Sequence, residues 1–499
     1  MAPSAPTTAR WCCRPRHSCQ PSEGRILMIV YNKFFSQGNA LPCSGESGYD
    51  VVSPVLGRTV GRVTFASLSD VEVAIHSAKE GLRIWSQSSL SDRKKALSEL
   101  LNALSTRGDD IAEALALEIG CPKFLGQSMQ LGMATKGIEL AIEGIDQITW
   151  EEMIGNGRVQ RVGTGIVAAL TPWNFPLHQI VAKVAAVIAA GCSVVLKPSE
   201  VSPGVAEIFA ECVAETSLPA GVFNMVWGGA DVGEYLVSHP DINHVSFTGS
   251  SAVGKAIMVK AAESLKRLTL ELGGKSAAVV LEDADLDIAI PHIVRMSLAN
   301  SGQTCVSQSR VIVPRKLIGE ITERYLNEAK QWKLGDPCQS ETRLGPVANE
   351  KQYRHVQRMI QNALNAGADV QTAGNLPVVG FENGYFVAPT VVSNVDATSE
   401  IAQQEIFGPV VCLLPYDTKE EAIEIANSTK YGLSGAVWSR DLERANKVAN
   451  QLQTGQVIIN GAPQNLATPF GGWKDSGFGR ENGKYGIEDL LVFRSIQGG

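Results

Sequence analysis

Apolar and polar residues alternate in a repeated pattern in the second quarter of the chain. Short apolar segments, typical of buried strands, fall at residues 166–171, 193–197, 222–226, 244–247 and 268–272. Stretches of helical length lie between them, at residues 178–190, 203–216, 231–238 and 252–263. Nearly continuous apolar strands separated by helices predict a parallel sheet that is covered on both faces.

The same alternation begins again after residue 274. Expected strands fall at residues 277–281, 310–313, 410–414, 435–438 and 456–459, and expected helices at 286–299, 318–332, 420–428 and 442–452. This pattern predicts a second α/β unit that meets the first near residues 271–274. Because parallel sheets bind ligands at the carboxyl ends of their strands, we expect a cleft there.

Elements at the two ends of the chain are less regular. A hairpin is expected at residues 51–58 and 61–66, followed by helices at 69–86, 92–107, 111–120 and 127–143. The polar segment 145–161 predicts an exposed hairpin, whose edge another subunit could extend, and residues 490–493 predict a final strand.

Length and composition exclude several classes of protein. A chain of 499 residues is too long for one ordinary core, so two or three domains are expected. A net charge of −7 argues against a nucleic-acid partner, and the sequence lacks the ~18 uninterrupted apolar residues of a membrane span. The cysteines and histidines show no metal-ligand spacing, so we expect no metal site, and we expect reduced thiols.

The first 27 residues are rich in arginine and carry one acid, Glu23. They contain no apolar segment of a secretory signal. An organellar transit peptide is one interpretation. A disordered extension before Met28 is the one we favour, together with a cytoplasmic location, because prolines interrupt any amphipathic helix.

Cys305 is the best candidate nucleophile. It follows the small and polar residues 302–304, between an expected helix and an expected strand. A free thiol has a pKa of ~8.5, so the site must help to ionise it. The alternative is a small buried side chain, which we expect for Cys192, Cys212 and Cys412.

Glu271 and Asn174 complete a possible catalytic set. Glu271 ends an apolar strand, where desolvation should raise its pKa and suit it to act as a general base. Asn174 lies between aromatic residues bracketed by prolines, and a rigidly held amide can donate to a developing oxyanion. A solvent-facing strand residue and a turn-forming asparagine are the simpler alternatives.

Three residues suggest a dinucleotide. Lys197 follows a buried strand and could bond ribose hydroxyls. Glu200 could accept from an adenosine ribose 2′-hydroxyl and would repel the 2′-phosphate of NADP, which favours NAD. Ser250 stands where a strand turns into a helix, whose N-terminus attracts phosphate.

Taken together, these motifs resemble the aldehyde dehydrogenase superfamily from Tyr49 to Arg494. The segments occur in the order PWNFP (172–176), KPSE (197–200), FTGS (247–250), LELGGK (270–275), GQTC (302–305), EIFGPV (405–410) and PFGG (469–472). The resemblance implies a Rossmann-type NAD-binding domain (28–145 and 164–273) and an α/β catalytic domain (274–475). It also implies a small β oligomerisation domain (146–163 and 476–499) and assembly as dimers or tetramers.

The resemblance also assigns roles. Cys305 would be the nucleophile, Glu271 the base and Asn174 an oxyanion donor. Cofactor contacts would come from Trp173, Lys197, Glu200, Phe247, Gly249, Ser250, Glu405 and Phe407. The pocket for the aldehyde substrate would be lined by Phe175, His178, Gln179, Thr304 and Phe470.

The implied reaction proceeds through a thiohemiacetal and a thioester on Cys305. Glu271 favours hydrolysis over transfer of the acyl group to coenzyme A, because relatives that use coenzyme A lack this glutamate. Ala182 stands where several relatives carry a bulky aromatic side chain, so longer or cyclic aldehydes are expected. Two rivals remain open: a cofactor-independent esterase and a scaffold protein that has lost catalysis.

Overall fold

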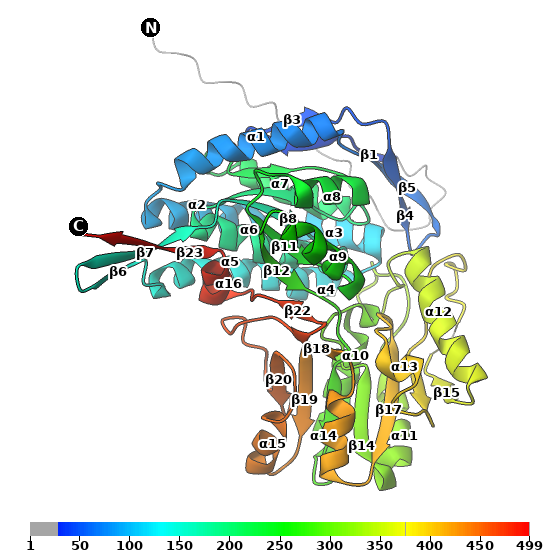
Figure 1. Ribbon diagram of the computed structural model, residues 1–499. Coiled ribbons are helices and arrows are strands. Elements are labelled where there is room, and N and C mark those ends of the chain that lie inside the picture. The colour runs from blue at the N-terminus through cyan, green and yellow to red at the C-terminus, as the bar shows by residue number, and fades with distance from the viewer. Residues whose placement is uncertain (1–27, 375, 499) are drawn as a thin grey trace.

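The structure, a computed structural model, describes residues 28–374 and 376–498. The leader discussed above, residues 1–27, lies outside the described residues. Two sheets built mainly of parallel strands form separate bodies, one above the other in Figure 1. The predicted α/β fold class with two sheets is therefore confirmed.

The first sheet has eight strands in the order β22-β12-β11-β8-β9-β10-β2-β3. Its parallel centre, from β12 to β10, contains the strands expected from the apolar pattern. All five residues of β8 are buried, as a strand covered on both faces requires. The bounds are β22 Gly477–Phe478, β12 Arg267–Glu271, β11 His244–Thr248, β8 Ile166–Leu170, β9 Ser193–Lys197, β10 Phe223–Met225, β2 Lys33–Ser36 and β3 Asn39–Pro42.

Helices cover this sheet on both faces (Figure 1). They are α1 Leu68–Trp85, α2 Leu90–Ser105, α3 Gly108–Ile119, α4 Lys123–Leu125, α5 Gly132–Gln147, α6 Pro176–Ala190, α7 Pro203–Ala214, α8 Ala230–Ser238 and α9 Ser251–Ala262. The helix expected at 127–143 forms, but its first turns, Gly126–Leu131, are π-helical, and α5 continues to Gln147.

The second sheet has seven strands in the order β15-β16-β17-β14-β13-β19-β20. The bounds are β15 Asp369–Thr372, β16 Thr390–Ser393, β17 Val410–Tyr416, β14 Arg310–Pro314, β13 Ala277–Val280, β19 Ser434–Trp438 and β20 Gln456–Ile459. The helices of this body are α10 Leu286–Leu298, α11 Ile318–Ala329, α12 Glu350–Asn365, α13 Glu400–Gln403, α14 Lys419–Asn427 and α15 Leu442–Ala449. The apolar pattern missed α12 because it buries little more than Val356, Met359 and Ala363.

A third, small sheet projects from the side of the molecule (Figure 1). The expected hairpin forms as β6 Glu151–Ile154 and β7 Gly157–Gly163, and the last strand, β23 Leu491–Gln497, pairs with β7. Every residue of β6 is exposed, so its outer edge is free to pair. Smaller elements complete the chain: β1 Ile29–Tyr31, β4 Gly48–Ser53, β5 Arg58–Thr64, β18 Tyr431–Gly432, β21 Trp473–Lys474 and α16 Gly483–Asp489.

Most of the described cysteines are free thiols. They are Cys43, Cys121, Cys192, Cys212, Cys305 and Cys412. Within residues 28–374 and 376–498, we find no helix that could cross a membrane.

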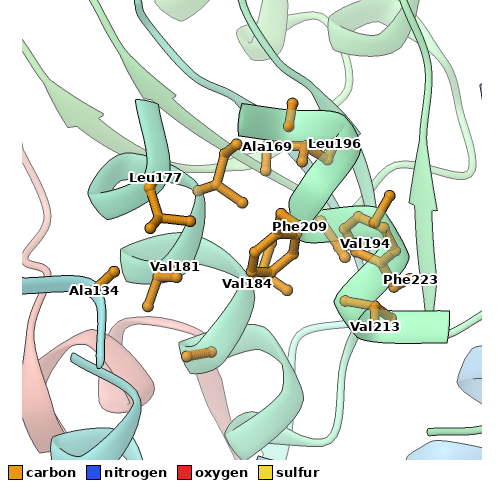
Figure 2. Packing of buried hydrophobic residues seen from close by; sticks show 14 of the residues in the cluster. Ala134, Ala169, Leu177, Val181, Val184, Val194, Leu196, Phe209, Val213 and Phe223 are labelled. Carbon is orange, nitrogen blue, oxygen red and sulfur yellow. The ribbon is translucent and has the colours of Figure 1, made fainter. Parts of the chain in front are cut away.

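The largest core lies between the first sheet and helices α6 and α7, and Figure 2 shows its centre. Val184 of α6 and Phe209 of α7 meet Val194 of β9 there. The Phe209 ring packs edge-on against Phe223, with ring centroids 5.5 Å apart. This packing fixes α6 against the sheet, and α6 carries the residues that follow Asn174.

Replacing Phe209 by alanine should destabilise the protein, because the ring is wholly buried and its loss leaves a cavity. We expect the free energy of unfolding to fall by about 3–5 kcal/mol, measured by urea unfolding. Ile84→Ala on α1, where the side chain is 55% exposed, is the control and should cost far less. Equal effects of the two substitutions would contradict the packing described here.

Candidate active site

The connection between the two sheets is the centre of the site. β12 ends at Glu271, and β13 of the second sheet begins at Ala277. A side chain at Gly274 would place its Cβ 2.3 Å from the backbone oxygen of Cys305, and one at Gly273 would lie 2.4 Å from a carboxylate oxygen of Glu405. Because the contact at Gly274 is with backbone, a side chain at that position would force the backbone to shift, whereas the Glu405 side chain near Gly273 could move. The connection therefore packs most tightly against the loop of Cys305.

Cys305 lies on a loop held in an unusual conformation. Asn300, Ser301 and Gly302 all have positive φ, at 52°, 57° and 72°. The Ser301 hydroxyl donates to the Gly345 carbonyl at 2.8 Å. Non-glycine residues adopt such angles only when their surroundings impose them, and they gather at functional sites. The loop therefore presents Cys305 in one fixed position.

Asn174 is hydrogen-bonded to this loop. Its side-chain Nδ2 donates to the Gln303 carbonyl at 2.9 Å, which leaves a second N–H on the same nitrogen. Its backbone oxygen accepts from Asn300 Nδ2 at 2.9 Å and from Gln130 Nε2 at 3.2 Å. The hydrogen bond to Gln303, which is two residues before Cys305 in the chain, therefore fixes the orientation of the Asn174 amide.

Glu271 is buried at the end of β12. The residue is 2% exposed, and neither carboxylate oxygen has a hydrogen-bond partner among the described residues. Burial raises the pKa of Glu271 well above its ordinary value, and the nearby Glu481 adds to the rise. The structure thus excludes the solvent-facing alternative for this side chain.

A buried ion pair lies close to Glu271. Lys183 Nζ donates to Glu481 at 2.5 Å and to the Thr248 hydroxyl at 2.8 Å. We did not predict this pair. The signal for it was a lysine in the apolar segment 180–190 of helix α6.

Burial raises the pKa of the Cys305 thiol to about 12, and the carboxylates of Glu405 and Glu271 contribute to the rise. Burial also raises the pKa of Glu405 to about 7, although the Gly274 N–H donates to this carboxylate at 2.9 Å. In this state the thiol is therefore neutral at pH 7.

Residues expected to bind the adenosine ribose lie at the carboxyl end of β9. Lys197 Nζ is 3.6 Å from a carboxylate oxygen of Glu200, and the lysine side chain is 12% exposed. Burial lowers the pKa of Lys197, and Glu200 partly offsets this effect. The structure thus places the two side chains side by side.

Residues expected near the phosphates and the nicotinamide lie on two further turns. Ser250 caps α9 by accepting from the Val253 N–H, and the Gly249 N–H donates to the Glu271 carbonyl at 3.0 Å. A Cβ at Gly249 would lie 2.3 Å from the Phe247 ring. This turn is therefore joined to the end of β12 that carries Glu271.

Trp173 and Phe407 face each other edge-on, with ring centroids 5.5 Å apart. Phe407 has a φ of 54°, and Gln352 Nε2 donates to its carbonyl at 2.8 Å. An aromatic residue from the loop after β8 therefore meets one from the loop before β17, beside Glu405.

Three of the expected substrate residues, Phe175, His178 and Gln179, lie at the start of α6. Phe175 and Gln179 are buried, and Thr304 is partly exposed. His178 lines a cavity together with Ala182 and Leu466. Phe470 is joined to Glu481 by two backbone hydrogen bonds of 2.9 and 2.8 Å. In the described part of the chain, no three His, Cys, Asp or Glu side chains are grouped as metal ligands.

Comparisons with known proteins agree on one family. The model of the aldehyde dehydrogenase family matches residues 42–496. A 3-succinoylsemialdehyde-pyridine dehydrogenase from Pseudomonas sp is 41% identical over 94% of this chain and 99% of its own length. The substrate in that name is a property of the relative.

Solved structures give the same result. One is a cysteine-to-alanine mutant of aldehyde dehydrogenase C from Pseudomonas syringae, solved with NAD+ and octanal. It superposes on this chain with a TM-score of 0.91 at 39% sequence identity, and the match covers 94% of this chain and 96% of that chain. A Mycobacterium tuberculosis aldehyde dehydrogenase complexed with NAD+ gives a TM-score of 0.91 at 38% identity, and the match covers 94% of this chain and 99% of that chain.

Glu405→Gln should lower the pKa of the Cys305 thiol, because it removes a negative charge that disfavours the thiolate. Above pH 7, where Glu405 is ionised, iodoacetamide should alkylate Cys305 several-fold faster in the variant. The measurement is the pH profile of alkylation, with the modified peptide identified by mass spectrometry. Glu400→Gln, which removes an exposed carboxylate, is the control. An unshifted profile would refute the electrostatic explanation.

Proposed function

Because the chain belongs to the aldehyde dehydrogenase family, we propose that it oxidises an aldehyde to the carboxylic acid with NAD, through a covalent intermediate on Cys305. The observation that carries this proposal is the convergence of three groups from separate segments. Asn174 bonds to the loop of Cys305, and Gly274, three residues after Glu271, packs against the Cys305 backbone.

The residues present fit an NAD molecule. Lys197 and Glu200 can bond the adenosine ribose, and the Ser250 end of α9 suits the pyrophosphate. Glu405 would hold the nicotinamide ribose, with Trp173 and Phe407 bordering the ring. When bound, NAD supplies the hydride acceptor of the reaction.

The first half of the reaction forms a bond between sulfur and carbon. The thiol loses its proton, and Cys305 Sγ attacks the aldehyde carbon to give a thiohemiacetal. The free N–H of Asn174 and the backbone N–H of Cys305 stabilise the oxyanion. Loss of a hydride from the same carbon leaves a thioester on Cys305.

The second half releases the acid. Glu271 takes a proton from a water molecule, the water oxygen attacks the thioester carbon, and the carbon–sulfur bond breaks to return the thiolate. Burial gives Glu271 the raised pKa that a general base needs. This glutamate favours hydrolysis over transfer to coenzyme A. If the protein were a cofactor-independent esterase or an inactive scaffold, the paired Lys197 and Glu200 would have no ligand to bind.

Other properties follow as proposals. Ala182 of α6, a small residue where several relatives carry a bulky aromatic side chain, favours longer or cyclic aldehydes. The exposed edge strand β6 and the strand β23 suit a homodimer or homotetramer. We propose a domain division at residues 28–145 and 164–273, 274–475, and 146–163 with 476–499. A cytoplasmic location remains our expectation.

Cys305→Ala should abolish oxidation of every aldehyde tested, because no nucleophile remains, while NAD binding persists. NADH absorbance measures turnover, and a fluorescence titration measures NAD binding. Cys212→Ala, which changes a buried cysteine of α7, is the control and should keep its activity. Dehydrogenase activity in the Cys305 variant would place the chemistry on another residue. Product formed by the wild type without NADH would favour the esterase.

Glu200→Ser should relax the choice between the two cofactors. A carboxylate there accepts from the 2′-hydroxyl of NAD and repels the 2′-phosphate of NADP. We expect the ratio of kcat/KM for NADP to that for NAD to rise about tenfold, which corresponds to about 1.4 kcal/mol. Glu215→Ser at the end of α7 is the control. If the ratio stays constant, Glu200 does not contact the ribose.

A further inference from the structure

A small cavity lies in the second body, between the first residues of β13 and β14 and the end of α14. Much of its wall is small or apolar: Ala277, Ala426, Leu433, Gly435 and Leu452. Two cations, Lys275 and Arg310, also line it, and none of the described residues in its wall carries a carboxylate. The cavity has room for a single particle of about the size of a water molecule. It therefore joins two positive charges to a very small space.

The ammonium group of Lys275 has no partner in this space. The residue is 2% exposed, and its Nζ has no hydrogen-bond partner among the described residues. Burial lowers the pKa of Lys275 to about 8, so the group still carries its charge at pH 7. An ammonium group has three N–H donors, and burying it unpaired is very costly. A ligand that accepts hydrogen bonds and carries negative charge removes this cost.

The Arg310 guanidinium is a second buried cation, held in place by backbone carbonyls. Its Nε donates to the Lys275 carbonyl at 2.9 Å, and its two terminal nitrogens donate to the carbonyls of Ile425 and Ala426 at 2.8 Å each. All three acceptors are neutral, so none of them offsets the charge. Each terminal nitrogen keeps a second N–H that can donate. Arg310 is thus a rigid cation with donors to spare.

The charged groups around the cavity leave an excess of positive charge. Burial lowers the pKa of Lys474 as well as that of Lys275, and the charge of Arg310 adds to the effect at both lysines. Burial raises the pKa of the Cys412 thiol, which is therefore neutral at pH 7. Burial also raises the pKa of Glu405 to about 7, so this carboxyl group is only partly ionised there. The nearby acidic groups therefore offset the two buried cations only in part.

We propose that this cavity is a binding site for a monatomic anion, chloride or another halide, held between Lys275 Nζ and the Arg310 guanidinium. A halide accepts several N–H donors at once and supplies the missing negative charge. Phosphate and carboxylates are too large for the space, and the two cations repel a metal ion. Asn427 and Thr454 line the cavity and are partly exposed, so an ion can enter between them.

A bound halide stabilises the segment that follows Gly274, and with it the connection between the two sheets. The site does not depend on the proposed aldehyde oxidation, because none of the groups assigned to that reaction lines the cavity. Its occupancy is therefore measured by stability and by diffraction, without an assay of turnover.

The first test follows thermal unfolding of the full chain in sodium gluconate, sodium chloride and sodium bromide at equal ionic strength. Gluconate is too large for the cavity and is the reference salt. We expect chloride and bromide to raise the Tm by about 3 °C in a saturable way, because a ligand that binds only the folded state stabilises it. Lys275→Met should lose this shift. Lys316→Met changes a lysine of the same body whose side chain is 65% exposed, and should keep it.

Crystals of the wild type grown in bromide decide the matter if Lys275→Met does not fold. We expect an anomalous bromide peak within hydrogen-bonding distance of Lys275 Nζ. A cavity that holds only water in these crystals overturns the proposal. An equal Tm of the wild type in all three salts, or a full shift in a folded Lys275→Met, also overturns it.

Discussion

The close backbone contact at Gly273 and Gly274 is the constraint on which the rest of the site depends. A Cβ at Gly274 would collide with the backbone oxygen of Cys305, and one at Gly273 with the carboxylate of Glu405. These two glycines lie in the connection between the sheets, directly after Glu271 of the first body. They let the backbone of this connection approach Cys305 and Glu405 of the second body closely. The two large bodies provide the rigid supports for this single contact.

Burial then determines the chemistry of the groups that meet there. Desolvation raises the pKa values of Cys305, Glu271 and Glu405, and the charges of the two carboxylates raise the pKa of Cys305 further. The raised pKa keeps the Cys305 thiol protonated at pH 7, so the negative charge of the nearby carboxylates must be offset before the thiolate forms.

Much of this organisation could be read from the sequence. The apolar strands of both sheets, the hairpin β6–β7 and the motif residues were recognisable because each depends on local pattern. The Lys183–Glu481 pair and the bond from Asn174 to Gln303 were not predictable, since they join residues 298 and 129 positions apart. Helix α12 was missed because its apolar face is narrow, with only Val356, Met359 and Ala363 buried, although these residues keep a helical spacing. The π-helical turns at Gly126–Leu131 lie within an expected helix and have no separate signature in the apolar pattern.

One measurement tests directly whether Glu271 and Cys305 act on the same carbon. Glu271→Gln is mixed with NAD and octanal, the reaction is quenched with acid, and the protein is examined by mass spectrometry. Because the base is missing while the nucleophile remains, the account predicts that an octanoyl thioester accumulates on the peptide containing Cys305. Absence of an adduct in a variant that still forms one equivalent of NADH, or an adduct on another cysteine, would contradict it.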